Sequence, residues 1–110
     1  MNKTLFILIS FIIFSCEEIS EKITNYSYLE YMEDGWEAFV YKEWNLGKEI
    51  FNIGLLQNND NYSEAYSGLG WIYFFEANTL PGEINNSIRD SLRNLSMINF
   101  NLAYLEGIYN

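Results

Sequence analysis

The chain has 110 residues, room for one domain, and nearly half of them are hydrophobic, so it can build a core. Its formal net charge is −9, from six basic against fifteen acidic residues. Such a surface repels phosphate backbones and argues against nucleic-acid binding. The chain has no histidine and a single cysteine, which excludes His-based catalysis, imidazole metal sites, internal disulfides and Cys-rich metal clusters.

The N-terminus has the features of an export signal. Lys3 supplies a positive charge, and the run from Leu5 to Phe14 is apolar apart from one serine. This run is shorter than the ~20 residues that a permanent membrane helix needs. It ends in Ile13-Phe14-Ser15-Cys16, which places an aliphatic and a small residue before the cysteine. The segment resembles the lipobox of bacterial lipoproteins, although Phe14 is bulkier than that family prefers.

This resemblance implies a lipid-anchored protein. Residues 1–15 would be a cleaved signal peptide, residues 16–24 an acidic tether lipidated on Cys16, and residues 25–110 the folded domain. Several acyl chains on one residue give stable anchoring. We therefore expect attachment to the cell outer membrane, on either its periplasmic face or its surface face. The alternative is an ordinary signal peptide, or a short anchor, that happens to contain a cysteine.

The first half of the domain has a helical pattern. From Asn25 to Phe75 there is no proline, and apolar residues recur at spacings of three and four over 28–39. A second apolar stripe covers 50–55. The cluster Asn58-Asn59-Asp60-Asn61 consists of turn formers and predicts a break between helices.

Two more helices are predicted after this break. One runs from about Ser63 to Glu76, with Ser63 as its N-cap. The segment 78–86 contains Pro81 and Gly82 and predicts a loop. The last helix is predicted by apolar residues spaced by three, four or seven: Ile84, Ile88, Leu92, Leu95, Ile98 (or Met97), Leu102 and Leu105. The fold class is therefore all-α.

The chain also repeats itself. Gly35-Trp36 recurs thirty-five residues later as Gly70-Trp71, close to the tetratricopeptide period of 34. The stretch 61–73 resembles the first helix of such a repeat, with aromatic residues and a Leu-Gly pair in the characteristic slots. These residues are Tyr66, Leu69, Gly70 and Tyr73.

The second helix of a tetratricopeptide repeat carries a small–Phe–small pattern, which occurs twice here. The first occurrence is Gly47, Phe51 and Gly54, and the second is Ser96, Phe100 and Ala103. The second lies about fourteen residues late, as an insertion around 78–86 would cause. The first repeat departs from the family, because Asp34 and Ala38 occupy its Leu and second aromatic slots. The resemblance implies about two repeats, and a generic helical hairpin array is the alternative.

The resemblance also implies a binding surface. In this family one side of each first helix lines a concave groove that takes peptide segments. Carried over by slot, the tentative groove residues are Trp36, Phe39, Trp71, Phe74 and Phe75, with Met32, Val40 and Ser67 beside them. The alternative is that these aromatic residues fill the core between helices.

The chain offers little for catalysis. Acidic pairs such as Glu64 with Glu76, or Glu30 with Glu33 and Asp34, are more simply read as solvated helix faces. We expect no catalytic residue, no metal site, no cofactor and no enzymatic activity.

These observations favour a membrane-tethered protein–protein interaction module of the bacterial cell envelope, with a peptide or protein as partner. The alternative is a glycan- or nutrient-binding outer-membrane lipoprotein. Two repeats are fewer than the ~3 that solenoids need for a continuous core. We therefore also expect self-association or continuation into further repeats.

Overall fold

The computed structural model describes residues 26–109, which form four α-helices and one short 3₁₀ turn. The helices are α2 (Tyr28–Val40), α3 (Trp44–Gly54), α4 (Ser63–Thr79) and α5 (Asn86–Tyr109), and the 3₁₀ turn is η1 (Glu83–Asn85). No strand occurs among these residues, so the predicted all-α class is confirmed for the described part of the chain.

The predictions for the N-terminal segment lie outside the described residues. They concern the signal peptide 1–15, lipidated Cys16 and the tether 16–24. Within residues 26–109, no helix combines the length and the apolar character needed to cross a membrane.

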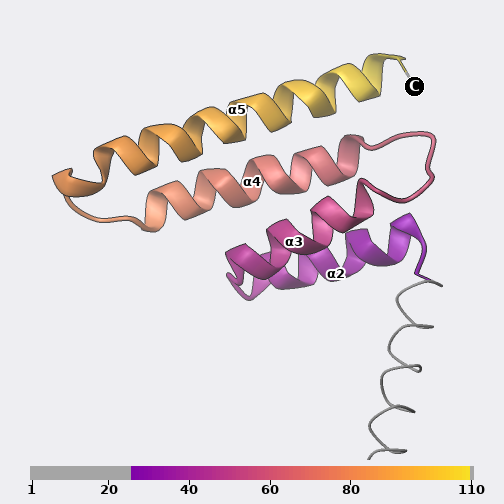
Figure 1. Cartoon of the computed structure of the whole chain (residues 1–110), viewed down its shortest axis with the longest axis horizontal. Helices are drawn as coiled ribbons and strands as arrows, with labels where there is room; N and C mark the ends of the chain where they lie inside the picture. The colour runs from indigo at the N-terminus through magenta and orange to yellow at the C-terminus, as the bar shows by residue number, and fades with distance from the viewer. Residues whose placement is uncertain (1–25, 110) are drawn as a thin grey trace, which may run out of the picture.

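The helices form two hairpins that lie side by side (Figure 1). Helices α4 and α5 pair along their length, and the shorter pair α2–α3 packs against α4, mainly through α3. Helices α2 and α5 do not meet. The α4–α5 hairpin extends beyond the shorter one at the end that carries η1.

Local hydrogen bonds fix both ends of α2. Ser27 caps its start, because the Ser27 hydroxyl accepts from the Glu30 amide while the Glu30 carboxylate accepts from the Ser27 amide. At its end Lys42 adopts a left-handed conformation with φ 59°. The amides of Lys42 and Glu43 then donate to the carbonyls of Phe39 and Ala38, which is a Schellman motif. The chain therefore reverses sharply into α3.

The link between α3 and α4 corrects one prediction. The break at 58–61 is confirmed, but the N-cap of α4 is Tyr62, and Ser63 is the first helical residue. The Ser63 amide is satisfied by the side-chain oxygen of Asn61 at 2.8 Å. Asn61 therefore takes the role expected of the Ser63 side chain. Helix α4 also continues three residues past its predicted end, to Thr79.

The core of the described residues is centred on Phe51, which is fully buried. A Cβ at Gly35 or at Gly68 would lie 2.7 Å or 2.4 Å from the Phe51 ring. The ring therefore fits between α2 and α4 because both helices present a glycine there. Met32 and Ile72 are also fully buried beside it.

The α4–α5 hairpin closes around a second glycine–phenylalanine contact. A Cβ at Gly70 would lie 2.8 Å from the Phe100 ring. Beside it the hydroxyl of Ser96, a buried residue, donates to the Gly70 carbonyl at 2.7 Å. Asn99 is buried too, and its side-chain amide donates to the Leu95 carbonyl. The face of α5 that meets α4 is therefore partly polar and closely packed.

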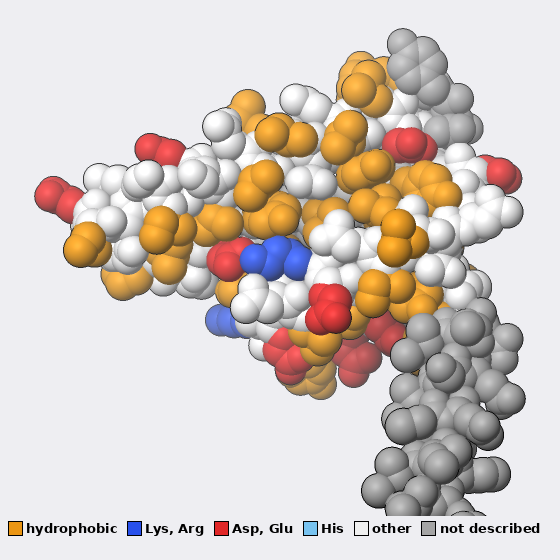
Figure 2. Space-filling model, viewed as in Figure 1, with side chains coloured by type: hydrophobic (Ala, Val, Ile, Leu, Met, Phe, Trp, Pro, Cys, Tyr) orange, Lys and Arg blue, Asp and Glu red, His pale blue; other side chains and the backbone are white. Residues whose placement is uncertain are grey.

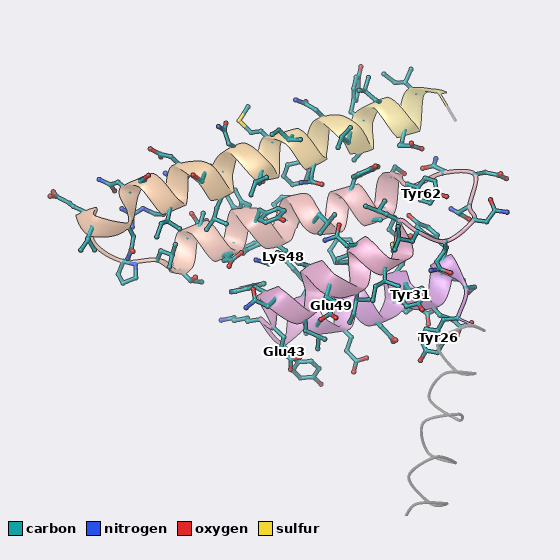
Figure 3. All side chains as sticks on the ribbon, in the orientation of Figure 1. Tyr26, Tyr31, Glu43, Lys48, Glu49 and Tyr62 are labelled. Carbon is teal, nitrogen blue, oxygen red and sulfur yellow. The ribbon has the colours of Figure 1, made fainter. Side chains whose placement is uncertain are left out.

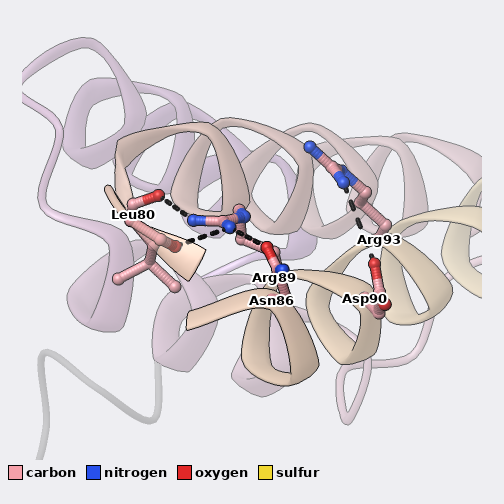
Figure 4. A network of polar contacts seen from close by, with 6 residues as sticks. Leu80, Asn86, Arg89, Asp90 and Arg93 are labelled. Carbon is pink, nitrogen blue, oxygen red and sulfur yellow. Dashed lines mark hydrogen bonds and ion pairs between the residues drawn. The ribbon is translucent and has the colours of Figure 1, made fainter. Parts of the chain in front are cut away.

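The segment predicted as a loop at 78–86 is shorter and more ordered than expected, because α4 ends at Thr79 and η1 precedes α5. Arg89 organises it, as Figure 4 shows. Its guanidinium donates to the carbonyls of Leu80 at 2.5 Å and Gly82 at 2.7 Å, and to the side-chain oxygen of Asn86. One side chain of α5 therefore holds both the end of α4 and the turn.

Candidate functional site

A chain of aromatic rings connects the two hairpins. Phe39 of α2 contacts Trp36 at 5.5 Å and Trp44 at 5.8 Å between ring centroids. It also contacts Phe75 of α4 at 5.5 Å. Trp44 and Phe75 lie nearly parallel, with an interplanar angle of 11°. Three helices therefore contribute rings to one surface.

The same surface continues along α4. The Trp71 ring contacts Phe74 at 5.9 Å and Phe75 at 6.0 Å, and it meets Phe100 of α5 at 5.1 Å. Trp71, Phe74 and Phe75 remain 44%, 39% and 40% exposed. We call this surface the aromatic shelf and define it by Trp36, Phe39, Trp44, Trp71, Phe74 and Phe75.

The sequence left open whether the predicted aromatic residues line a groove or fill the core, and the structure places some of them in each environment. Trp36 and Phe39 are half-buried and pack against the core, and Trp36 contacts Phe51 at 5.2 Å. Trp71, Phe74 and Phe75 are exposed and belong to no buried cluster. Trp44 was not among the groove residues predicted from the sequence, yet its ring contacts both Phe39 and Phe75. Its position at the first turn of α3, beside Phe39, was the available sign that it joins the surface.

The residues predicted to pack the repeats lie at helix contacts. Gly47 faces Ile72 and Gly54 faces Met32, each so closely that a Cβ would lie within 2.7 Å of the neighbouring side chain. Leu69 and Ala103 are buried, and Tyr66 and Tyr73 are half-buried.

Two carboxylates beside the shelf are held by structural contacts. The Trp36 indole Nε1–H donates to Glu64 Oε1 at 3.1 Å. Glu76 pairs with Lys48 Nζ at 2.9 Å, and that ammonium also lies 5.3 Å from the centre of the Tyr73 ring. Figure 3 shows Lys48 between α3 and α4.

These contacts argue against a catalytic carboxylate pair on α4. Glu64 and Glu76 are twelve residues apart on one helix, a rise of about 18 Å. Glycoside hydrolysis requires separations of roughly 5–9.5 Å. Glu30 is engaged in the cap of α2, so it serves that helix end. The described residues contain no group of three His, Cys, Asp or Glu side chains that could hold a metal ion.

One hollow of about 440 Å³ meets the shelf only at its edge, through Trp44, and is otherwise lined by Lys42, Glu43, Asn45, Leu46 and Glu76. A shallow cleft of about 440 Å³ lies on the α2–α3 hairpin, on the flank of α2 opposite Trp36, and is lined by Asp34, Glu37, Ala38, Tyr41, Glu43, Leu46 and Ile50. The aromatic shelf is therefore an open surface and suits an extended segment better than an enclosed small molecule.

The chain was compared with known protein families, curated proteins and solved structures. No family model, curated protein or solved structure matches the chain.

Proposed function

We propose that the protein is a membrane-tethered interaction module whose aromatic shelf binds an apolar segment of a peptide or protein partner. The observation that carries this proposal is the exposure of Trp71, Phe74 and Phe75, side by side on one helix. Large aromatic residues dominate binding energy at protein interfaces. An exposed row of them on a helix is a ready docking surface.

The shelf is pre-organised. Trp71 is wedged against Phe100, and Phe75 is stacked on Trp44, so the exposed rings are held by rings beneath and beside them. A surface that is already ordered loses little conformational entropy on binding. Glu64 borders the shelf and the whole chain carries a net charge of −9, so the preferred partner is an apolar segment flanked by Lys or Arg.

The proposed repeat rests on matching contacts in the two hairpins. Gly35 receives the Phe51 ring and Gly70 receives the Phe100 ring. The following tryptophan crosses the same phenylalanine each time, at 5.2 Å and 76° in the first hairpin and 5.1 Å and 80° in the second. These pairs support a tetratricopeptide-like repeat of two helical hairpins.

A second pair of contacts supports this correspondence. A Cβ at Gly47 would lie 3.7 Å from the carbonyl oxygen of Gly35, and the Ser96 hydroxyl donates to the carbonyl of Gly70. Gly47 and Ser96 therefore occupy matching places. The extra residues of the second hairpin extend α4 and α5 at the η1 end, where Figure 1 shows the longer pair projecting.

The proposed address rests on the sequence of the N-terminal segment. Ile13-Phe14-Ser15-Cys16 supports cleavage before Cys16 and lipidation there, which would tether the domain to the outer membrane. We propose no enzymatic activity, no cofactor and no nucleic-acid partner.

A peptide-display selection tests the proposed function. The full chain in a mild detergent is panned with a random peptide library, and enriched peptides are measured again with the Trp71→Ala variant. We expect enriched sequences that combine apolar and basic residues, and a loss of affinity of about 30-fold or more in Trp71→Ala.

Tyr41→Ala is the matched control, because Tyr41 is an exposed aromatic residue on the same molecule that lies outside the shelf. Binding that survives Trp71→Ala, or that Tyr41→Ala weakens equally, would contradict the shelf as the site. Binding that follows sugar identity on a glycan array, with no peptide enriched, would instead favour a glycan- or nutrient-binding lipoprotein.

A further inference from the structure

Helix α5 carries an aliphatic stripe that the described fold leaves uncovered. Its members are between 37% and 53% exposed, and they are Ile88, Leu95, Ile98, Leu102 and Leu105. Ile88, Leu95 and Leu102 are seven residues apart, and so are Ile98 and Leu105. We call these five residues the α5 seam. Their spacing is that of the a and d positions of a coiled coil.

The α5 seam is distinct from the face that α5 turns to α4. That face holds Arg89, Leu92, Ser96, Asn99, Phe100 and Ala103, which are buried or half-buried. The more hydrophobic side of the helix is therefore the exposed side. Such an arrangement is costly in water unless another surface covers it.

Continuation of the helical array does not account for the α5 seam. In the first hairpin, α3 meets α4 through Trp44, Lys48 and Phe51. The hairpin correspondence proposed above maps these residues onto the Arg93, Met97 and Phe100 flank of α5. A following helix would pack on that flank.

Two α3 residues that match the α5 seam indicate that stacking of hairpins uses another side, whereas Ile53, the match of Leu102, is half-buried against the core. Leu46 matches Leu95, and Glu49 matches Ile98 by the same spacing. Both Leu46 and Glu49 are exposed, and α4 leaves them uncovered. At Leu95 and Ile98 the seam therefore lies on a side that stacking of hairpins leaves open.

We infer that the α5 seam pairs with the same seam of a second copy, in antiparallel orientation. Antiparallel pairing about the midpoint of the seam sets Ile88 opposite Leu105 and Leu95 opposite Ile98 of the second copy. The contact then covers about 26 Å of helix. Antiparallel helices also place opposite dipole ends side by side.

Charge favours this partner. Helix α5 carries Arg89 and Arg93 against Asp90 and Glu106, so it is neutral within an acidic molecule. Neither arginine borders the seam, because Arg89 donates to the carbonyls of Leu80 and Gly82 and Arg93 lies on the flank that carries Met97. Ser91 occupies the d position between Ile88 and Leu95. The seam is bordered by Ser87, Asn94 and Asn101 on one side and by Leu92, Asn99 and Glu106 on the other.

The position of α5 reduces repulsion between copies. Helix α2 carries four acidic residues and no basic one, and it does not meet α5. Figure 2 shows acidic side chains gathered over the α2–α3 hairpin and only isolated ones along α5. Pairing through α5 keeps the acidic α2–α3 hairpins of the two copies apart. At physiological salt, charges separated by more than about 8 Å are largely screened, so the two hairpins repel each other little.

Sedimentation of the full chain in a mild detergent tests the pairing. The wild type should pass from monomer to dimer as its concentration rises. Ile98→Lys should weaken the dimer by about 30-fold or more, because it places a charge at the centre of the seam. The neighbouring Met97→Lys is the matched control, since Met97 is exposed on the other flank. A monomeric wild type, or an equal loss with Met97→Lys, would overturn the inference.

Disulfide cross-linking in cells tests the orientation without relying on a charge. Full-length Ile88→Cys and Leu105→Cys chains are co-expressed with different tags, and the wild type reports any link through Cys16. We expect a disulfide between the two different variants. Ile88→Cys linked to itself, or no link above the wild-type background, contradicts antiparallel pairing. Peptide binding at the shelf is measured separately, so either proposal can fail alone.

Discussion

Glycine contacts explain why particular residues occupy particular positions in this fold. Gly70 lies against Phe100, whereas a Cβ at Gly107, also in a helix, would meet nothing within 4 Å beyond its chain neighbours and the backbone of its own helix. The same substitution should therefore have opposite effects at the two positions. Glycine in a helix is otherwise unfavourable relative to alanine.

We predict that Gly70→Ala lowers the free energy of unfolding by about 1–3 kcal/mol, because the added methyl group displaces the Phe100 ring. Gly107→Ala should raise it, by up to about 1 kcal/mol. Urea denaturation followed by circular dichroism measures both. Equal effects of the two substitutions would mean that Gly70 does not lie at a close helix contact.

The buried hydroxyl of Tyr28 makes the stability of the fold depend on pH. Burial raises the pKa of its hydroxyl above the ordinary value of 10.0, and the hydrogen bond from the Ala65 amide partly opposes this rise. The folded state therefore keeps the proton at pH values where the unfolded chain loses it. The stabilising contribution of Tyr28 is complete below about pH 10 and is lost as the pH rises further.

We predict that Tyr28→Phe makes the stability of the protein less steeply dependent on pH above pH 10. The variant also loses the hydrogen bond to Ala65, about 1 kcal/mol at neutral pH. Thermal melts between pH 8 and pH 11 measure the slope, and exposed Tyr104→Phe is the control. An unchanged slope in Tyr28→Phe would contradict the role of its buried hydroxyl.

At the scale of elements, hydrophobic periodicity predicted the last helix but not its orientation. The exposed α5 seam is more apolar than the face against α4, which carries Ser96 and Asn99. That face is selected by the fit of Phe100 to Gly70 and by the Ser96 hydrogen bond. The shape of the contact and the hydrogen bonds between helices decide which face of α5 packs against α4. The number of apolar residues on each face does not predict this.

Helix boundaries show the same limit. The asparagine-rich turn and the Pro-Gly loop were predictable because those residues favour turns. The sharp reversal after α2 was not predictable from the sequence, because a lysine and not a glycine adopts the left-handed conformation there. Among the shelf residues, the resemblance to a tetratricopeptide repeat predicted Trp71, Phe74 and Phe75 as groove residues. Their exposure depends on how α3 and α5 pack against α4.

Arg89 gives a prediction for the α4–α5 turn. Arg89→Lys should release the carbonyls of Leu80 and Gly82, because an ammonium cannot reproduce the planar, branched set of donors. We expect faster amide hydrogen exchange across residues 80–86. Arg93→Lys is the control, since its exposed pair with Asp90 at 3.9 Å contributes little. Equal exchange in both variants would contradict the clamp.

At the scale of the whole molecule, the proposed lipid anchor and the helical domain should be separable. We predict that Cys16→Ser abolishes incorporation of radiolabelled palmitate and blocks processing of the N-terminal segment, because the thiol proposed to carry the lipid is removed. The helical content measured by circular dichroism should stay unchanged. Labelled palmitate that still enters the variant would contradict the lipobox interpretation.

The domain is proposed to bind through one shelf and to pair through another face. The shelf joins α2, α3 and α4, whereas the α5 seam lies on α5 alone. The two surfaces can therefore be occupied together, and a paired molecule would present two shelves to one partner. Two linked shelves bind a partner with repeated segments more tightly than one.

The three tryptophans of the chain offer the most direct test of the central claim. Trp36, Trp44 and Trp71 all belong to the aromatic shelf. The ¹⁵N-labelled protein therefore gives three indole N–H resonances, and every one of them reports on the shelf. On titration with a peptide enriched by display, we predict saturable shifts that are largest for Trp71, the most exposed of the three. A peptide that binds while all three indole resonances stay in place would contradict the account.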